Sequence, residues 1–211
     1  MIMFGAAALV AFGFLAHSVS HGRALSGVDR HVFTSCRGTV TGTAAGERFW
    51  VLASLAGSPA SMTLLAVLGA LWLGWRRRTP MLVWWITAFA GTSLLIFVLK
   101  RAFHRVRPDG AELFLHGASL SFPSGHAAGA MVGFGMLTYM LSRYVVNSAI
   151  HRASLVVIAA GIVGLIAYSR LCLGVHYPSD VIAGLLLGTA WLIIGVTANE
   201  FTYRQRVRDR A

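Results

Sequence analysis

The sequence predicts an all-α fold, a six-transmembrane-helix bundle that forms a single domain over residues 1–211. Composition is the first indication: hydrophobic residues make up 56% of the chain and charged residues only 12%, whereas about a quarter of an average soluble domain is charged. The second indication is that the hydrophobic residues gather in runs of about 20, the length that crosses ~30 Å of hydrocarbon as a helix. The third is that charged residues fall between these runs.

The amino-terminal part of the chain predicts one span followed by a polar connection. Residues 1–20 are apolar and carry no charged side chain. Because the charged start of a signal peptide is missing, we expect a membrane span there rather than a cleaved leader. Charged residues interrupt any span over 21–52. The partly helical spacing of Val28, Val32 and Phe33 favours a short helix in the membrane interface, and an ordinary loop is the alternative.

Further hydrophobic runs complete the bundle. Arg76–Arg78 follow the second of the six and Lys100 closes the third. Gly125, Gly129 and Gly133 recur every four residues along the fourth, a spacing that lets membrane helices pack closely. The remaining expected spans cover residues 51–75, 81–99, 125–142, 153–169 and 180–198.

Basic residues near the span ends indicate the orientation through the positive-inside rule. In the six-span layout the two sides carry equal numbers of Lys and Arg. Lys100, Arg107 and Arg170 belong to motifs described below and have their own reason to be where they are. When these three are not counted, more Lys and Arg residues lie on the side of the two chain ends than on the other side. They also lie close to the spans, as at Arg76–Arg78. We therefore expect both termini in the cytoplasm.

Other classes of protein are disfavoured. A net charge of +11 is compatible with nucleic-acid binding, yet the basic residues are scattered between apolar runs and no nucleic-acid motif is present, so no nucleic-acid partner is expected. Cys36 and Cys172 are too few for a disulfide framework and lack the spacing of a metal site. The sequence also offers no acidic cluster suited to Mg²⁺. No metal and no cofactor are expected.

Three polar stretches stand out against the hydrophobic background. They lie in or beside two connections, one between the third and fourth spans and one between the fifth and sixth. Because an even number of crossings separates these connections, we expect all three stretches on the same membrane face. They are Lys100 with Arg107-Pro108, Pro123-Ser124-Gly125-His126, and Ser169-Arg170 with His176 and Asp180.

Part of this set suits an anion. Lys100, Arg107 and Arg170 are cations beside the membrane; Arg presents a planar fork that matches phosphate oxygens, and Lys a point charge. Ser124 and Gly125 stand where a loop enters a helix, and a helix start offers exposed N–H groups and a positive dipole end. Taken singly, each feature has an ordinary alternative, as a basic anchor at a span end or a helix cap.

The remaining residues, His126, His176 and Asp180, suit proton transfer and nucleophilic attack. A neutral imidazole can act as nucleophile or base, and an imidazolium as an acid. His176 and Asp180 are four residues apart, so at a helix start they share a face, and the carboxylate could fix the tautomer of the ring. A lone histidine near a membrane edge is more often simply hydrogen-bonded. The joint order and spacing of the residues favours a site.

Taken together, the three stretches resemble the type 2 phosphatidic acid phosphatases, the membrane branch of the phosphatidic-acid-phosphatase and haloperoxidase superfamily. The pattern of that family is K-x6-R-P, then P-S-G-H, then S-R-x5-H-x3-D, and the sequence matches every defining position. The six-span layout is similar too, so the resemblance extends over nearly the whole chain.

The resemblance implies a metal-independent lipid phosphatase that works through a phosphohistidine. His176 is expected to attack phosphorus, and Asp180 to orient and activate His176. His126 is expected to protonate the leaving oxygen and later to assist water. The residues expected to hold the phosphate are Lys100, Arg107, Ser124, Gly125 and Arg170.

The substrate class stays broad. A site at the membrane edge suits a lipid whose phosphate reaches water, and phosphatidic acid, phosphatidylglycerol phosphate and undecaprenyl pyrophosphate all fit. The expected setting is a bacterial inner membrane, with membrane lipids as neighbours and the site on the outer face. A lipid phosphotransferase with an acceptor other than water, and a non-enzymatic transporter, are the alternatives. Arg101, His104 and Arg105 could steer an anionic substrate or bind lipid head groups, and solvated loop charges are the alternative.

Overall fold

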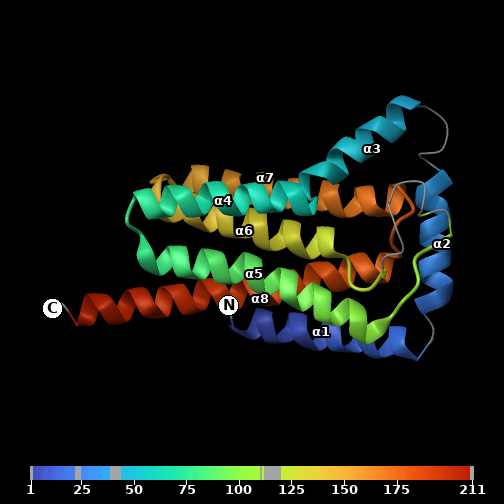
Figure 1. Cartoon of the computed structure of the whole chain (residues 1–211), viewed down its shortest axis with the longest axis horizontal. Helices are drawn as coiled ribbons and strands as arrows, with labels where there is room; N and C mark the ends of the chain where they lie inside the picture. Colours follow the sequence, from blue (N-terminus) through green and yellow to red (C-terminus); the bar gives the residue numbers. More distant parts are fainter. Residues whose placement is uncertain (1, 22–24, 39–43, 110, 112–119, 210–211) are drawn as a thin grey trace.

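The computed structural model describes residues 2–21, 25–38, 44–109, 111 and 120–209. Within these residues the chain forms helices and no strand, and most of the helices run side by side along the long axis of the molecule (Figure 1). The predicted all-α fold is therefore correct. The helices are α1 (Ile2–Ser20), α2 (Leu25–Gly38), α3 (Ala44–Ala56), α4 (Pro59–Trp75), α5 (Thr79–Phe103), α6 (Gly125–Tyr144), α7 (Ala149–Cys172) and α8 (Pro178–Arg208).

Five stretches in the described part of the chain are long and apolar enough to cross a membrane. They are α1, α3 together with α4, α5, α7 and α8. The expected fourth span, residues 125–142, corresponds to α6, and α6 is not among these five stretches. This helix lies inside the bundle, packed against α4, α5, α7 and α8. Neighbouring helices rather than lipid cover much of its surface, so its small and polar residues do not have to face hydrocarbon.

The second expected span is divided into two helices. The sequence predicts one run over 51–75, but α3 ends at Ala56 and α4 begins at Pro59. The Ser58 hydroxyl accepts the backbone N–H of Ser61 at 3.2 Å, and Pro59 occupies the first turn, where its missing N–H costs no hydrogen bond. This cap starts α4 afresh, and α3 leans away from the bundle (Figure 1).

Of the two alternatives for the polar connection, the helix is correct. α2 lies across one end of the bundle, steeply inclined to the other helices (Figure 1), and it contacts α7 and α8. The end of α5, the start of α6, the end of α7 and the start of α8 all lie at this end (Figure 1). α2 therefore sits over the part of the molecule that carries the three polar stretches.

Close packing of α6 against α8 fixes how these stretches meet. A Cβ atom added at Gly184 would lie 2.5 Å from the backbone oxygen of Ser124, and one added at Gly188 would lie 2.9 Å from that of Ala128. Only glycine allows the two backbones to come so near. One consequence is a direct hydrogen bond, 2.9 Å long, from the Ser124 N–H to the carbonyl oxygen of Asp180.

We therefore expect Gly184→Ala to lower both thermal stability and activity. The added methyl must push backbone rather than a flexible side chain, and overpacking of this kind costs about 1–3 kcal/mol. Gly195→Ala is the matched control, because a Cβ atom at that position of the same helix meets nothing within 4 Å. Melting curves and turnover in detergent would test this, and equal behaviour of the two variants would contradict it.

Candidate active site

The three polar stretches converge at the end of the bundle that α2 covers. The guanidinium of Arg107 lies 3.2 Å from Nε2 of His176, and its Nη1 also donates to the carbonyl oxygen of Val175 at 2.6 Å. Ser124 is tied to Asp180 by the backbone hydrogen bond described above. Segments separated by about 70 residues in the chain thus meet within hydrogen-bonding distance.

His176 and Asp180 form a buried pair. The ring of His176 is 1% exposed and the carboxylate of Asp180 is fully buried, with Nδ1 and Oδ2 3.5 Å apart. His176 precedes α8, which begins at Pro178, and Asp180 lies in the first turn of that helix. The Ser121 hydroxyl lies 3.4 Å from Nδ1 and donates to Oδ2 of Asp180. The Tyr177 N–H donates to the same oxygen at 2.9 Å.

Burial decides the protonation state of the His176 ring. It lowers the pKa of His176 to about 3; Asp180 pulls the pKa upward, while the positive charges of Arg107 and Arg170 add to the lowering. The ring is therefore neutral over the physiological pH range. With Nδ1 facing the carboxylate, the network assigns the ring proton to Nδ1 and leaves a lone pair on Nε2. Nε2 is the atom beside Arg107, at the edge of the pocket.

Arg170 has the features of a residue that binds an anion. It is only 4% exposed, and its Nη1 donates to the hydroxyl of Ser54 on α3. Its Nε and Nη2 are buried and have no hydrogen-bond partner within the described part of the chain. Buried polar groups are nearly always paired, so two unpaired donors on one guanidinium indicate an acceptor that binds there.

Lys100 and the start of α6 are the other groups that the sequence predicts to hold the phosphate. The ammonium of Lys100, in the last turn of α5, donates to the carbonyl oxygen of Leu120. Ser124 is the N-cap of α6, and its hydroxyl accepts the Ala127 N–H at 3.5 Å. Gly125 is the first residue of that helix. The positive end of the α6 dipole therefore adds to the side-chain charges.

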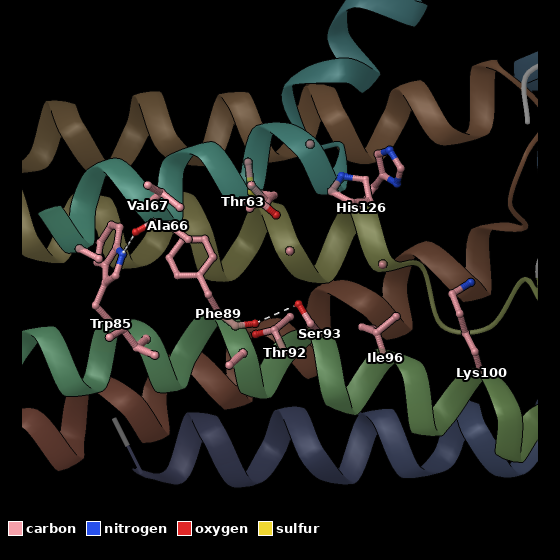
Figure 2. A pocket seen from close by; sticks show the side chains of 18 of the residues that line it. Thr63, Ala66, Val67, Trp85, Phe89, Thr92, Ser93, Ile96, Lys100 and His126 are labelled. Carbon is pink, nitrogen blue, oxygen red and sulfur yellow. Dashed lines mark hydrogen bonds between the residues drawn. The ribbon is translucent and has the colours of Figure 1, made fainter.

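A pocket of about 630 Å³ opens beside these groups. Lys100, Arg107, His126 and His176 lie at its polar end, and Figure 2 shows Lys100 and His126 at one end and Trp85 at the other. Between them the pocket runs along α4 and α5 past mostly apolar side chains. The lining residues of this part include Met62, Thr63, Ala66, Val67, Phe89 and Ile96.

Trp85 closes the apolar end of the pocket and is held firmly. Its Nε1 donates to the carbonyl oxygen of Ala66 at 2.8 Å, and its side chain is fully buried. A Cβ atom at Gly69 would lie 2.1 Å from the indole, so α4 has a glycine where the ring approaches it. The pocket thus joins a cationic end to an apolar groove that reaches Trp85.

The structure also places residues at the site that the sequence did not single out. Asp29 of α2 is buried, and Ser121 bridges His176 and Asp180 as described. Arg105 is not a solvated loop charge: its side chain is 19% exposed and pairs with Asp29 at 2.8 Å and with Asp180 at 2.6 Å. The sequence holds one signal for Asp29: it lies four residues before Phe33, and therefore on the same face of the predicted helix as that apolar residue. Ser121 has none.

Comparisons with known proteins cover the part of the chain that carries the site. Residues 81–204, which contain all three polar stretches, match the family model of the PAP2 superfamily. The chain is similar to phosphatidylglycerophosphatase B of Bacillus subtilis (strain 168), with 33% identity over 147 residues that cover 69% of this chain and 71% of the relative. It is also 33% identical over 154 residues to decaprenylphosphoryl-5-phosphoribose phosphatase of Mycobacterium tuberculosis (strain CDC 1551 / Oshkosh), covering 70% of this chain and 75% of the relative.

A solved structure extends the similarity to the whole fold. The crystal structure of a transmembrane PAP2-type phosphatidylglycerolphosphate phosphatase from Bacillus subtilis superposes with a TM-score of 0.84 and 26% identity. The match covers 93% of this chain and 96% of that one.

We expect the His176 ring to stay neutral well below the pH at which an exposed histidine gains a proton, about 6.5. Its pKa of about 3 reflects burial, which disfavours the charged ring. NMR of ¹⁵N-histidine-labelled protein in detergent, with His176→Gln to assign the signal, should show a neutral ring from about pH 8 down to about pH 5. A His176 signal that titrates near pH 6.5 would contradict the assignment.

Proposed function

This chain belongs to the PAP2 superfamily, and on that footing we propose that it hydrolyses a lipid phosphate through a phosphohistidine formed on His176. The chain is a phosphoric monoester hydrolase that acts on lipid phosphates, and it is an integral membrane protein. The proposal concerns the roles of the residues, the kind of lipid and the topology.

The observation that carries the mechanism is the geometry around Nε2 of His176. Nε2 carries the lone pair of a neutral, buried ring and lies 3.2 Å from a guanidinium nitrogen of Arg107. Arg170 has two buried nitrogen atoms without a partner in the described part of the chain, and its positive charge also acts on the His176 ring. A phosphate that enters here would accept the N–H groups of both arginines. The Arg107 donor would then pass from Nε2 to a phosphate oxygen, which frees the lone pair to attack.

The proposed reaction has two displacements at phosphorus. In the first, the Nε2–P bond forms and the bond from phosphorus to the lipid oxygen breaks, while His126 gives a proton to that oxygen. In the second, His126 takes a proton from water, the water oxygen bonds to phosphorus and the Nε2–P bond breaks. The ring becomes positively charged in the intermediate, and Asp180 beside Nδ1 stabilises that charge.

The phosphate-binding residues supply the electrostatic part of the proposal. Phosphoryl transfer depends mainly on positioning and on stabilising the charge of the equatorial oxygens. Lys100 and Arg107 bring two positive charges to one end of the pocket, and the charge of Arg170 acts on both Lys100 and His176 there. The start of α6 at Ser124 and Gly125 brings N–H groups. In the proposal these groups do the work that a metal ion does in other phosphatases.

The shape of the pocket supports a lipid as substrate. Its apolar groove leads from the cationic end between α4 and α5 to Trp85, so a phosphate and the chain attached to it can be bound at the same time. Phosphatidic acid, phosphatidylglycerol phosphate and undecaprenyl pyrophosphate all combine a terminal phosphate with long apolar chains. Of the relatives named above, one carries the name of a phosphatidylglycerophosphatase and the other that of a decaprenylphosphoryl-5-phosphoribose phosphatase.

The topology is part of the proposal as well. We place α6 as a sixth span, surrounded by the other helices, which gives six crossings and both termini on one side. The positive-inside rule then puts both termini in the cytoplasm of a bacterial inner membrane and the site on the outer face. α2 would lie in the outer interface, over the site.

Replacing His176 with Gln should reduce phosphate release from lipid phosphates by at least about 10⁴-fold, as expected for loss of a covalent nucleophile. EDTA should leave the wild-type rate unchanged. His151→Gln, at an exposed position of α7, is the matched control. Activity that survives in His176→Gln, or that EDTA abolishes in the wild type, would contradict the mechanism. If no free phosphate is released and the phosphoryl group appears on an added alcohol acceptor instead, the enzyme is a phosphotransferase.

His126→Ala should slow hydrolysis in proportion to the basicity of the leaving group. A lipid alkoxide needs a proton when it departs, whereas a nitrophenolate does not. The value of kcat/KM, which reports the first displacement, should therefore fall about 10²–10⁴-fold on a lipid phosphate and much less on a nitrophenyl phosphate. Equal losses on both substrates would argue against a role as the acid.

Filling the groove should discriminate between long and short lipids. Thr63 lines the pocket, while its neighbour Leu64 is 59% exposed and is not a lining residue. Displacing two or more buried CH₂ groups costs about 0.8 kcal/mol each, so Thr63→Trp should raise KM for a dioleoyl lipid phosphate by about tenfold or more. KM for a dihexanoyl analogue should change less, and Leu64→Trp should change neither. A Thr63→Trp variant with unchanged KM for both lipids would place the chains elsewhere.

A further inference from the structure

We propose that Asp29, on α2 and outside the pocket, is a positioning residue for the reaction and acts through Arg105 on Asp180. The inference rests on the proposed function, because it concerns how Asp180 supports His176. It extends the site to a helix that none of the three polar stretches reaches.

Asp29 is one of the few buried carboxylates of the described chain. Its side chain is 4% exposed, and both of its oxygens are engaged. Oδ1 accepts the backbone N–H of Ser179 at 2.9 Å, and Oδ2 accepts the hydroxyl of the same residue at 2.5 Å. Oδ2 also accepts Nη2 of Arg105 at 2.8 Å. A carboxylate buried with charge-assisted partners on both oxygens is a fixed element of the structure.

Arg105 links this carboxylate to the active site. While Nη2 bonds Asp29, Nη1 donates to Oδ1 of Asp180 at 2.6 Å and to the Ser179 hydroxyl at 2.7 Å. The guanidinium also lies over the ring of Tyr177, 4.4 Å from its centre. One planar fork thus spans two carboxylates, and its plane is held by an aromatic face.

The charge balance gives the link a function. Oδ1 of Asp180 accepts a hydrogen bond from Arg105. Oδ2 accepts the Ser121 hydroxyl and the Tyr177 N–H, and it is the oxygen that faces Nδ1 of His176. With Asp29 present, the single positive charge of Arg105 is shared between two carboxylates, so Asp180 retains negative charge to offer the His176 ring when that ring becomes cationic. Without Asp29, the guanidinium would interact with Asp180 alone, and less of the negative charge of Asp180 would act on His176.

A purely structural role makes a different prediction. Asp29 also accepts an N–H from the first turn of α8, as a helix cap would, and it could simply hold that helix in place. A cap contributes to stability independently of Arg105. A positioning residue that acts through Arg105 matters only while Arg105 is present.

A double-mutant cycle with Asp29→Asn and Arg105→Gln separates the two roles. We expect Asp29→Asn, which keeps the shape but loses the charge, to lower kcat by about 10-fold or more. KM should change little, because Asp29 does not line the pocket. In the Arg105→Gln background the same substitution should cause no further loss. Arg30→Gln, at an exposed position of α2, is the control that should retain the wild-type rate.

Each outcome of the cycle bears on the proposal. Equal fold-losses of kcat from Asp29→Asn in both backgrounds, or a wild-type kcat in Asp29→Asn, would overturn it. If Asp29→Asn does not yield folded protein, Arg105→Lys tests the same link, since an ammonium cannot bridge both carboxylates as the fork does; a wild-type kcat in that variant would overturn the proposal. A wild-type protein that releases no phosphate from any lipid phosphate would overturn the proposed function, and this inference with it.

Discussion

The carboxylate of Asp180 is fully buried at the start of α8, and a buried charge is stable only where neighbouring groups satisfy it. Ser121, the N–H of Tyr177 and Arg105 do so from the two connections. Each of these contacts ties a different stretch of chain to the same two oxygen atoms. The arrangement of the loops therefore follows from the requirement to keep Asp180 charged beside His176.

The bundle supplies the positions from which these groups reach one point. Gly184 lets α8 approach α6 closely enough for the Ser124 N–H to bond Asp180, so the anion-binding helix start and the carboxylate share one frame. The break between α3 and α4 leaves Ser54 beside Arg170 and starts α4 along the pocket. Across the end of the bundle, α2 adds Asp29. The packing of the helices therefore determines the geometry of the site.

The sequence predicted the parts of this arrangement that depend on local composition and spacing. Apolar runs mark the spans, and the spacings around Lys100, His126 and His176 identify the family, because both are properties of short segments. What could not be predicted depends on contacts between distant segments. Arg105 looks like a loop charge until Asp29 and Asp180 are seen on either side of it. The central place of α6 was equally hidden, since its glycines and polar residues lower its hydropathy but do not reveal which helices surround it.

The stereochemical course at phosphorus tests the central claim most directly. A lipid phosphate made chiral with oxygen isotopes and sulfur would be hydrolysed in isotopically labelled water, and the configuration of the released thiophosphate determined. Each in-line displacement inverts phosphorus, so a phosphohistidine on His176 followed by attack of water predicts net retention. Net inversion would mean that water attacks the lipid phosphate directly, and it would contradict the covalent role of His176.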